Sequence, residues 1–518
     1  MRIHRLLVAA LLGIFLARIA LTYRVFNDTS DEAFHLVAGL EYWQRGRYQY
    51  EVQHPPLARL VVAALPYFFG GLRIDHHNTL WDHGPWNERD VAFYWRTLSL
   101  ARAGNLLFAV LLFAFVYRWS LLLHGPNAAL AACALLACCP NVLAHAGLAT
   151  LDLAAAATVL MTAFFLWRWV ERPAFSVALA AGTALGAAVL SKFSALAFLP
   201  PAALLFFLTG WFTRQRRPRL AHAAVAASAA GLVIWAGYRF EVHALAPPGH
   251  RYIGKFATGQ QSGLPARLSR AIENRTLPAP GFWQGVIDLT SHDQEGHPAY
   301  LLGRWSQRGW WYYFPIAVLL KTTLPLLVLS ALVLVRRGPP EELYPIWLTV
   351  VVLVVSMAAS LNIGIRHVLV IYPLLAILAS GLFRDPGRWR VAALALLAWH
   401  AAESLAAHPD YLPYFNQIAR GREHHFLVDS NLDWGQDLHR LARHLRQNHI
   451  DDIQLSYVGQ TNPDKFGIPH RALDWEHPRP GWVGISVQHL MGSTTPWRFH
   501  IQPSARVGKS IWLYYREK

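Results

Sequence analysis

Long apolar runs separated by short basic loops dominate the chain. Runs of about 18–25 residues recur, and each is long enough to cross the ~30 Å hydrocarbon core of a bilayer. The first run, from Leu6 to about Tyr23, exceeds the length of a signal-peptide core and lacks a small-residue cleavage site, so we expect a retained helix. The pattern predicts an all-α polytopic membrane protein.

The apolar runs predict about eleven transmembrane helices, near residues 5–24, 98–122, 126–145, 150–170, 175–191, 194–212, 220–240, 311–335, 343–362, 366–383 and 391–407. With the N-terminus inside, the Arg-rich clusters between these helices all fall in the cytoplasm, as the positive-inside rule requires. The run Pro55–Gly71 would break this phase if it crossed, so we expect an interfacial or re-entrant helix there. The C-terminus is then extracytoplasmic.

This topology places most of the polar chain on the outer face. The predicted organisation is a first transmembrane helix (1–24), a first outer loop with an acidic motif and an interfacial helix (25–97), helices 2–7 (98–240), a second outer loop (241–309), helices 8–11 (310–407) and an outer C-terminal α/β domain (408–518). A protein with its polar mass on one side is expected to work on that side.

The C-terminal region has the pattern of a small α/β unit. Phe426–Val428 is strand-like, and Asp433 is expected to cap a helix over 435–447. Further strands are expected at Ile453–Val458, Trp482–Val487 and Ser510–Tyr515. The loop Asp429–Trp434 would connect a strand end to a helix N-terminus, a common ligand position. A well-capped turn is the alternative.

Composition agrees with a membrane protein, since 54% of the residues are hydrophobic and only 15% are charged, against about 25% in soluble domains. The net charge of +16 could suggest nucleic acid, but much of it lies in short loops that alternate with apolar runs, so we expect no nucleic-acid partner. Cys133, Cys138 and Cys139 fall in one predicted helix and are expected to pack as small hydrophobic side chains. Gly182 and Gly186 predict close packing between helices of this chain.

An acidic pair at the outer end of the first helix carries the strongest chemical signal. Asp31 and Glu32 lie beside lipid, where a charge is costly and usually functional. Sugar transfer from a lipid-linked phosphate would need a carboxylate at the acceptor hydroxyl and fixed cations around the phosphate. Asp31 or Glu32 can supply the carboxylate.

Candidate cations lie near or within the outer halves of predicted helices, and they are Arg102, Lys192, Arg239, Arg366 and His367. Each has a structural alternative. Lys192 and Arg239 could extend to the interface, and the Arg366-His367 pair could anchor a helix end. Asp152 could cap a helix or orient one of the cations. Lys321 could pair with lipid phosphate or with an internal carboxylate.

Metal-ligand residue types occur in the segment Asp75-His76-His77…Asp82-His83, but the spacing matches no specific metal site. We therefore expect no cofactor, with a divalent metal as the alternative. The aromatic side chains from Trp305 to Tyr313 are expected to form an interfacial belt, and lining an acceptor groove is the alternative.

The acidic pair and its neighbours carry a family resemblance. Asp31-Glu32-x-x-His35, a tyrosine-rich stretch and His54-Pro55-Pro56-Leu57 resemble the first-loop signature of the protein O-mannosyltransferases, glycosyltransferase family 39 of the GT-C superfamily. Further segments are similar to bacterial phospholipid carrier-dependent members, namely Pro140…His145…Thr150-Leu151-Asp152, Ser191-Lys192, Tyr312–Pro315 with Lys321, Arg366-His367 and Asp429-Ser-Asn-Leu-Asp-Trp-Gly-Gln-Asp437. The resemblance spans nearly the whole chain.

The resemblance implies a bacterial inner-membrane enzyme that moves a mannose-like sugar from a polyprenyl-phosphate donor, with inversion, on the extracytoplasmic face. It implies that Asp31 is the catalytic carboxylate and Glu32 a supporting one. His35, His54 and Asp152 would support the site, and Arg102 would face the phosphate. The chain departs from the eukaryotic mannosyltransferases because residues 241–309 are too short for their β-trefoil insertion.

The acceptor is therefore open between a protein and a lipid or surface glycan, as in the aminoarabinose transferases. From a different class, a transporter or flippase of lipid-linked sugar is the alternative. Transporters often show paired repeats, whereas this sequence shows no internal duplication, which favours the transferase over the transporter.

Overall fold

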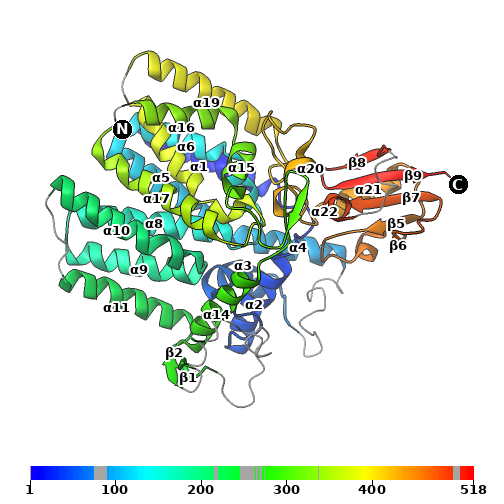
Figure 1. The fold of residues 1–518 in the computed structure, drawn as a ribbon, viewed down its shortest axis with the longest axis horizontal. Coiled ribbons are helices and arrows are strands. Elements are labelled where there is room, and N and C mark those ends of the chain that lie inside the picture. Colours follow the sequence, from blue (N-terminus) through cyan, green and yellow to red (C-terminus); the bar gives the residue numbers. More distant parts are fainter. Residues whose placement is uncertain are drawn as a thin grey trace.

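The computed structural model describes residues 2–74, 90–214, 220–245, 275–336, 338–384, 386–493 and 502–517, together with positions 263, 267, 271 and 272. The apolar helices pack into one bundle, and a small sheet domain lies at one end of it (Figure 1). A continuous hydrophobic core runs through the bundle and reaches that sheet at Val483 and Ile485. This confirms the predicted fold class, a helical membrane protein with a C-terminal α/β domain.

The helices of the bundle are α1 (Arg2–Ala20), α4 (Val91–Gly104), α5 (Leu106–His124), α6 (Pro126–Ala137), α7 (Pro140–Ala146), α8 (Asp152–Glu171), α9 (Phe175–Ser191), α10 (Ser194–Arg214), α11 (Leu220–Gly237), α15 (Tyr313–Lys321), α16 (Leu324–Val335), α17 (Leu343–Ala358), α18 (Ile371–Ser380) and α19 (Arg388–Ala406). Within the described residues, length and composition support six membrane spans, or eight if each of two bent helix pairs is one span. Every predicted segment coincides with a helix or helix pair, but the count of eleven spans stays a prediction.

Two segments that the sequence predicts as single helices are bent. α6 and α7 meet at 63° at Cys138-Cys139, directly before Pro140, so these two cysteines lie in a break rather than in a helix. α15 and α16 meet at 116° before Pro325, which corrects the prediction of one helix over 311–335. Proline lacks the N–H of a helical turn and its ring clashes with the carbonyl of the turn before it, which explains both bends.

Three short helices lie beside the bundle, namely α2 (Glu32–Arg45), α3 (Pro56–Phe68) and α14 (Pro280–Glu295). Two small hairpins accompany them, β1 (Val242–Ala244) with β2 (Thr276–Pro278) and β3 (Ala299–Leu301) with β4 (Arg304–Ser306). α3 has 13 residues, too few for the ~20 that a membrane helix needs. A Cβ atom on Gly39 of α2 would lie 2.2 Å from the carbonyl oxygen of Arg59, so α2 and α3 meet backbone to backbone.

The C-terminal domain contains α20 (Glu423–Phe426), α21 (Leu438–Gln447), β5 (Ile453–Ser456), β6 (His470–Ala472), β7 (Gly481–Ser486), α22 (Val487–Gly492), β8 (Ala505–Val507) and β9 (Ile511–Arg516). Its sheet has the strand order β6-β5-β7-β9-β8, in which β5 is parallel to β6 and β7 while β9 is antiparallel to β7 and β8. Short 3-10 helices are η1 (Pro340–Glu342), η2 (Ile365–Val368), η3 (Gly381–Phe383), η4 (Asp429–Asn431) and η5 (Pro463–Phe466).

Two predictions for this domain are wrong. Phe426–Val428 forms no strand, because Phe426 ends α20 and the next residues lead into η4. The helix begins at Leu438 rather than Gly435, because Gly435 has a left-handed φ of 79° that is incompatible with a right-handed helical turn. The Asp433 carboxylate accepts hydrogen bonds from the backbone N–H groups of Gly435, in the loop, and Gln488, in α22, instead of capping the helix.

Packing joins the parts of the molecule. The small-residue pattern on α9 packs against α11, where a Cβ atom on Gly182 would lie 2.2 Å from the carbonyl oxygen of Ala226. The prediction of close packing within the chain is therefore confirmed.

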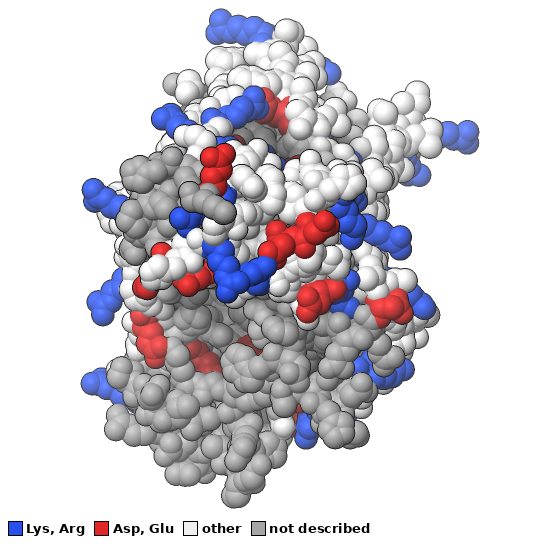
Figure 2. Space-filling model, turned by 90° about the vertical axis from the view of Figure 1, so that its right-hand side faces the viewer, with Lys and Arg blue, Asp and Glu red and all other residues white. Residues whose placement is uncertain are grey.

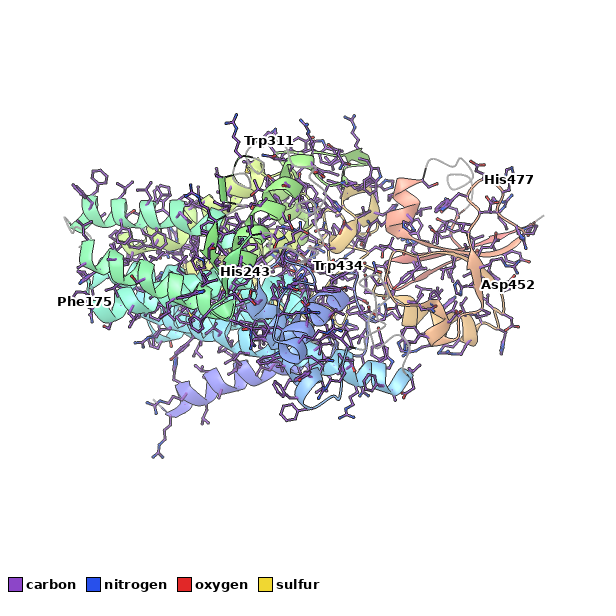
Figure 3. The ribbon with its side chains drawn as sticks, turned by 90° about the horizontal axis from the view of Figure 1, so that it is seen from below. Phe175, His243, Trp311, Trp434, Asp452 and His477 are labelled. Atoms are coloured by element: carbon purple, nitrogen blue, oxygen red, sulfur yellow. The ribbon has the colours of Figure 1, made fainter. Side chains whose placement is uncertain are left out.

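Trp434 lies where the bundle meets the C-terminal domain, whereas Asp452 and His477 lie at the far end of that domain (Figure 3). On the described part of that far face, Lys and Arg side chains are interspersed with Asp and Glu and form no continuous basic patch (Figure 2).

Candidate active site

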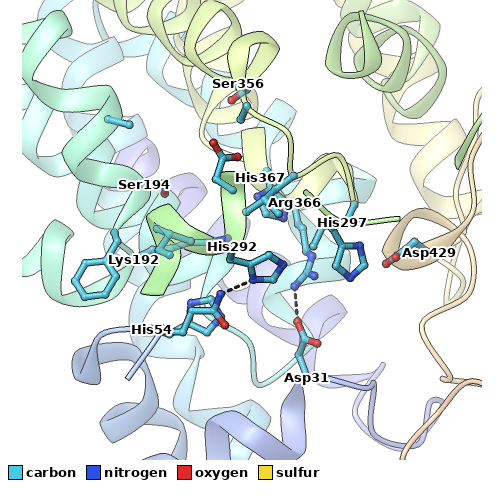
Figure 4. Close-up of a pocket in the computed structure, with 18 of the residues that line it drawn as sticks. Asp31, His54, Lys192, Ser194, His292, His297, Ser356, Arg366, His367 and Asp429 are labelled. Atoms are coloured by element: carbon cyan, nitrogen blue, oxygen red, sulfur yellow. Dashed lines mark hydrogen bonds and ion pairs between the residues drawn. The ribbon is translucent and has the colours of Figure 1, made fainter. Parts of the chain in front are cut away.

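A cavity of about 780 Å³ lies between the bundle, the first-loop helices and the C-terminal domain (Figure 4). Part of its lining is apolar and consists of Phe193, Phe198, Leu289, Phe314, Val355 and Leu361. The polar lining includes Asp31, His54, Lys192, His292, Arg366 and Asp429. One cavity therefore offers both an apolar surface and fixed charges.

Asp31 forms an ion pair with Arg366 inside this cavity. Asp31 is the N-cap residue of α2, but its side chain makes no capping hydrogen bond. Its Oδ2 instead accepts a hydrogen bond from Nη1 of Arg366 at 2.6 Å. The guanidinium also lies over the Trp434 ring, 4.2 Å from the centroid, and its Nε is buried with no partner among the described residues. Because 30% of the Asp31 side chain is exposed, the carboxylate is available to a ligand.

Glu32, the next residue, points away from the cavity. Its carboxylate accepts hydrogen bonds from Nε and Nη2 of Arg102, both at 2.8 Å, and from the backbone N–H groups of Thr29 and Ala149. The remaining Arg102 donors bind the carbonyl oxygens of Tyr23, Phe26 and Asn27. Arg102 is fully buried and has no donor left for a phosphate, so the structure corrects its prediction as a phosphate ligand. It also places Glu32 outside the site.

Lys192 lies in the cavity at the break between α9 and α10. Its Nζ donates to Oδ1 of Asp152 at 2.7 Å, and Asp152 is buried behind it at the start of α8. His367 lines the same cavity, and its Nε2 is buried without a partner among the described residues. Arg239 does not line the cavity, because its guanidinium lies over the Tyr42 ring, 5.3 Å from the centroid. The structure thus brings Lys192, Arg366 and His367 together and leaves Arg239 outside.

The two predicted supporting histidines also line the cavity. The rings of His35 and His54 pack edge to face, with their centroids 5.5 Å apart. Burial lowers the pKa of His54 to about 4, which favours a neutral ring in this cavity. Arg59 donates to Nδ1 of His35 at 3.2 Å and forms an ion pair with Glu51. The sequence analysis missed Arg59, although a charge within the apolar run Pro55–Gly71 is a usable signal.

Four further lining residues were not predicted as site residues. Asp429 and Trp434 come from the loop that the sequence identified as a ligand position, but no role was assigned to them. Burial raises the pKa of the Asp429 carboxyl, and the nearby Arg366 guanidinium opposes that rise. His292 lies in α14 and His297 lies between α14 and β3, and His292 Nδ1 is 2.5 Å from Nε2 of Gln53. No sequence pattern distinguishes these two histidines from others in polar loops.

Potential metal ligands are not grouped in the part of the chain that the structure describes. Within those residues, no three His, Cys, Asp or Glu side chains lie close enough together to hold a metal ion. The histidine-rich segment 75–83, which the sequence analysis considered for a metal, lies outside the described residues.

Comparisons with known proteins bear on the fold and on part of the sequence. Residues 97–236 match the sequence model of the dolichyl-phosphate-mannose-protein mannosyltransferase family. No curated protein matches the sequence. The fold is similar to ArnT from Cupriavidus metallidurans bound to undecaprenyl phosphate, with a TM-score of 0.53, 13% identity, and coverage of 98% of this chain and 97% of that chain.

The apo structure of ArnT gives a TM-score of 0.50 with the same identity and coverage. The chain therefore has the GT-C fold over nearly its whole length. It also resembles the mannosyltransferase family in sequence over its central helices.

Proposed function

We propose that this chain transfers a mannose-like sugar from a polyprenyl-phosphate donor to an acceptor hydroxyl. The cavity carries the proposal, because an apolar wall beside a carboxylate and several cations suits a donor made of a lipid chain, a phosphate and a sugar. ArnT, which shares the fold, binds undecaprenyl phosphate, and the matched family is named for dolichyl-phosphate-mannose. Both support a lipid-phosphate carrier.

In this reaction Asp31 accepts the proton of the acceptor hydroxyl while the hydroxyl oxygen bonds to the anomeric carbon. The bond between that carbon and the phosphate oxygen breaks, and the electron pair leaves with the polyprenyl phosphate. Lys192 and Arg366 stabilise the negative charge that grows on the phosphate. Arg366 can offer two parallel N–H donors, while Lys192 acts as a point charge. Attack opposite the leaving phosphate would invert the anomeric carbon.

A release assay tests this function. Purified full-length protein is incubated with radiolabelled polyprenyl-phosphate sugars and a membrane extract, and the labelled products are separated. Transfer is expected to consume one donor, release the polyprenyl phosphate and label a protein, lipid or glycan. If vesicle-reconstituted protein moves the donor across the membrane without cleaving it, the chain is a transporter or flippase instead.

The proposed reaction takes place on the extracytoplasmic side. This orientation rests on the Arg-rich loops, which alternate in phase with the predicted spans. A reporter enzyme that is active only outside the cytoplasm, fused after Lys518, is expected to work. Activity of a cytoplasmic reporter alone would contradict the orientation and mean that the number of crossings differs by one.

A further inference from the structure

The C-terminal domain contributes a second carboxylate to the cavity. Asp429 begins η4 and lines the cavity together with Asp31 and Arg366. Its Oδ1 accepts a hydrogen bond from the backbone N–H of Ser430 at 2.5 Å. Its Oδ2 makes no hydrogen bond to the residues that the structure describes, and it is not sealed from the cavity. This oxygen is therefore open to a ligand.

The backbone of Asp429 is held in a costly conformation. Its φ is 56°, a left-handed value that favours glycine and that a side chain such as aspartate adopts at some cost. Such a conformation persists only when the surrounding structure enforces it, and it is often found at functional sites. This conformation and the hydrogen bond from the Ser430 N–H together fix the position of the carboxylate.

Contacts between the loop and the bundle enforce that position. Ser430 Oγ donates to the carbonyl oxygen of Ile363 at 2.6 Å, and Asn431 Oδ1 accepts from the N–H of Ile365 at 3.0 Å. Lys321, buried at the bend after α15, donates from Nζ to the carbonyl oxygen of Asn431 at 2.6 Å. These bonds tie the loop both to the segment that carries Arg366 and to the bundle. Lys321 thus binds the backbone carbonyl oxygens of Leu412 and Asn431, rather than the lipid phosphate or the internal carboxylate that the sequence suggested.

The order of groups along the cavity separates Asp429 from Lys192, one of the two cations that would hold the phosphate. Lys192 lies on one side of the Asp31–Arg366 pair, while His297 and Asp429 lie on the other (Figure 4). A carboxylate repels a phosphate group and accepts hydrogen bonds from hydroxyl groups. In a displacement with inversion, the attacking oxygen approaches from the side opposite the leaving phosphate. If the phosphate lies near Lys192, the acceptor therefore enters the part of the cavity that contains Asp429.

We propose that Asp429 binds the acceptor by accepting a hydrogen bond from a second hydroxyl group beside the one that attacks. This inference rests on the proposed function, and it assigns the acceptor wall of the cavity to the C-terminal domain. Carbohydrates carry hydroxyl groups on adjacent carbons, so the class of acceptor that this wall fits is a glycan. A serine or threonine side chain would offer Asp31 one hydroxyl and leave Asp429 unused.

The test compares Asp429→Asn and Asp429→Gly with the wild type. Asparagine and glycine both tolerate a φ of 56°, so both variants are expected to fold. The control is Asp452→Asn, because Asp452 lies at the far end of the same domain and its side chain is 60% exposed. Each purified full-length protein is assayed for binding of undecaprenyl phosphate and for transfer across a dilution series of the membrane extract.

Both Asp429 variants are expected to bind undecaprenyl phosphate within about twofold of the wild type. They should need about tenfold more extract for half-maximal transfer, the effect of losing one hydrogen bond to a charged group. The control variant should match the wild type in both assays. Unchanged extract dependence, or a loss confined to undecaprenyl-phosphate binding, would overturn the assignment of Asp429 to the acceptor.

The two proposals fail in different ways. If the wild type consumes no polyprenyl-phosphate sugar, the proposed function is wrong and the role of Asp429 falls with it. If the wild type is active but its labelled product is a protein side chain, only the glycan acceptor is wrong.

Discussion

The ion pairs Asp31–Arg366 and Glu32–Arg102 both join a carboxylate to a guanidinium. Their carboxylates belong to adjacent residues, yet the surroundings of the two pairs differ. Glu32 and Arg102 are both buried, and Arg102 donates to the Glu32 carboxylate and to three backbone carbonyl groups. Arg366 donates one hydrogen bond to Asp31, and its Nε lacks a partner among the described residues. Asp31 is partly exposed in the cavity.

This difference separates a structural ion pair from a binding site. A ligand can bind the Asp31–Arg366 pair through the hydrogen-bonding capacity that the protein leaves unused. The same ligand could bind Glu32 or Arg102 only by breaking bonds in a buried network, which would leave charged groups unpaired at high cost. Spare hydrogen-bonding capacity together with exposure, rather than charge alone, is the reason that we propose Asp31 and not Glu32 as the catalytic carboxylate.

The largest effect is expected on stability, from Arg102→Leu. This change leaves the Glu32 carboxylate buried without its partner, a loss of about 3–5 kcal/mol. Thermal unfolding in detergent and the yield of folded protein measure it. The double variant Arg102→Leu with Glu32→Leu should recover part of the loss. A well-folded Arg102→Leu protein with weakened donor binding would contradict the structural role and restore Arg102 as a phosphate ligand.

Asp31→Asn should abolish most activity without destabilising the protein. Asparagine keeps the size of the side chain and an oxygen that can accept the hydrogen bond from Arg366, but it cannot accept the acceptor proton, so transfer should fall by at least about a hundredfold. Initial rates with radiolabelled donor measure the loss, and detergent melting serves as the control. Near-normal turnover in the intact variant would refute the proposed mechanism and strengthen the transporter alternative.

Arg366→Lys should have an intermediate effect. Lysine keeps the charge but loses the planar group that contacts Asp31 and stacks on Trp434, so donor use should fall by about tenfold. Arg366→Ala should fall further because it also removes the charge. Donor saturation curves for the two variants measure this difference. Equal loss in both would indicate that planarity, not charge, is what the site requires.

Arg239→Ala should have the smallest effect. Arg239 is exposed and contacts the Tyr42 ring outside the cavity, so activity should stay within about twofold of the wild type. The same initial-rate assay measures it. A loss as large as that of Arg366→Lys would show that the donor site extends beyond the cavity described above.

The sequence by itself determined the helical membrane class, the approximate helix positions and the three C-terminal strands β5, β7 and β9, because hydrophobic periodicity is a local property. It also singled out Asp31, Lys192 and Arg366, which line the cavity, since charges beside apolar runs stand out. It could not tell which arginine pairs with which carboxylate.

Tertiary structure decided those pairings. Asp31 and Arg366 are 335 positions apart, so no local pattern relates them. One residue step turns a helical side chain by about 100°, and that turn directs Glu32 to the buried Arg102 while Asp31 faces the cavity. Asp429 reaches the cavity only because the C-terminal domain docks on the bundle through hydrogen bonds between distant backbone and side-chain groups.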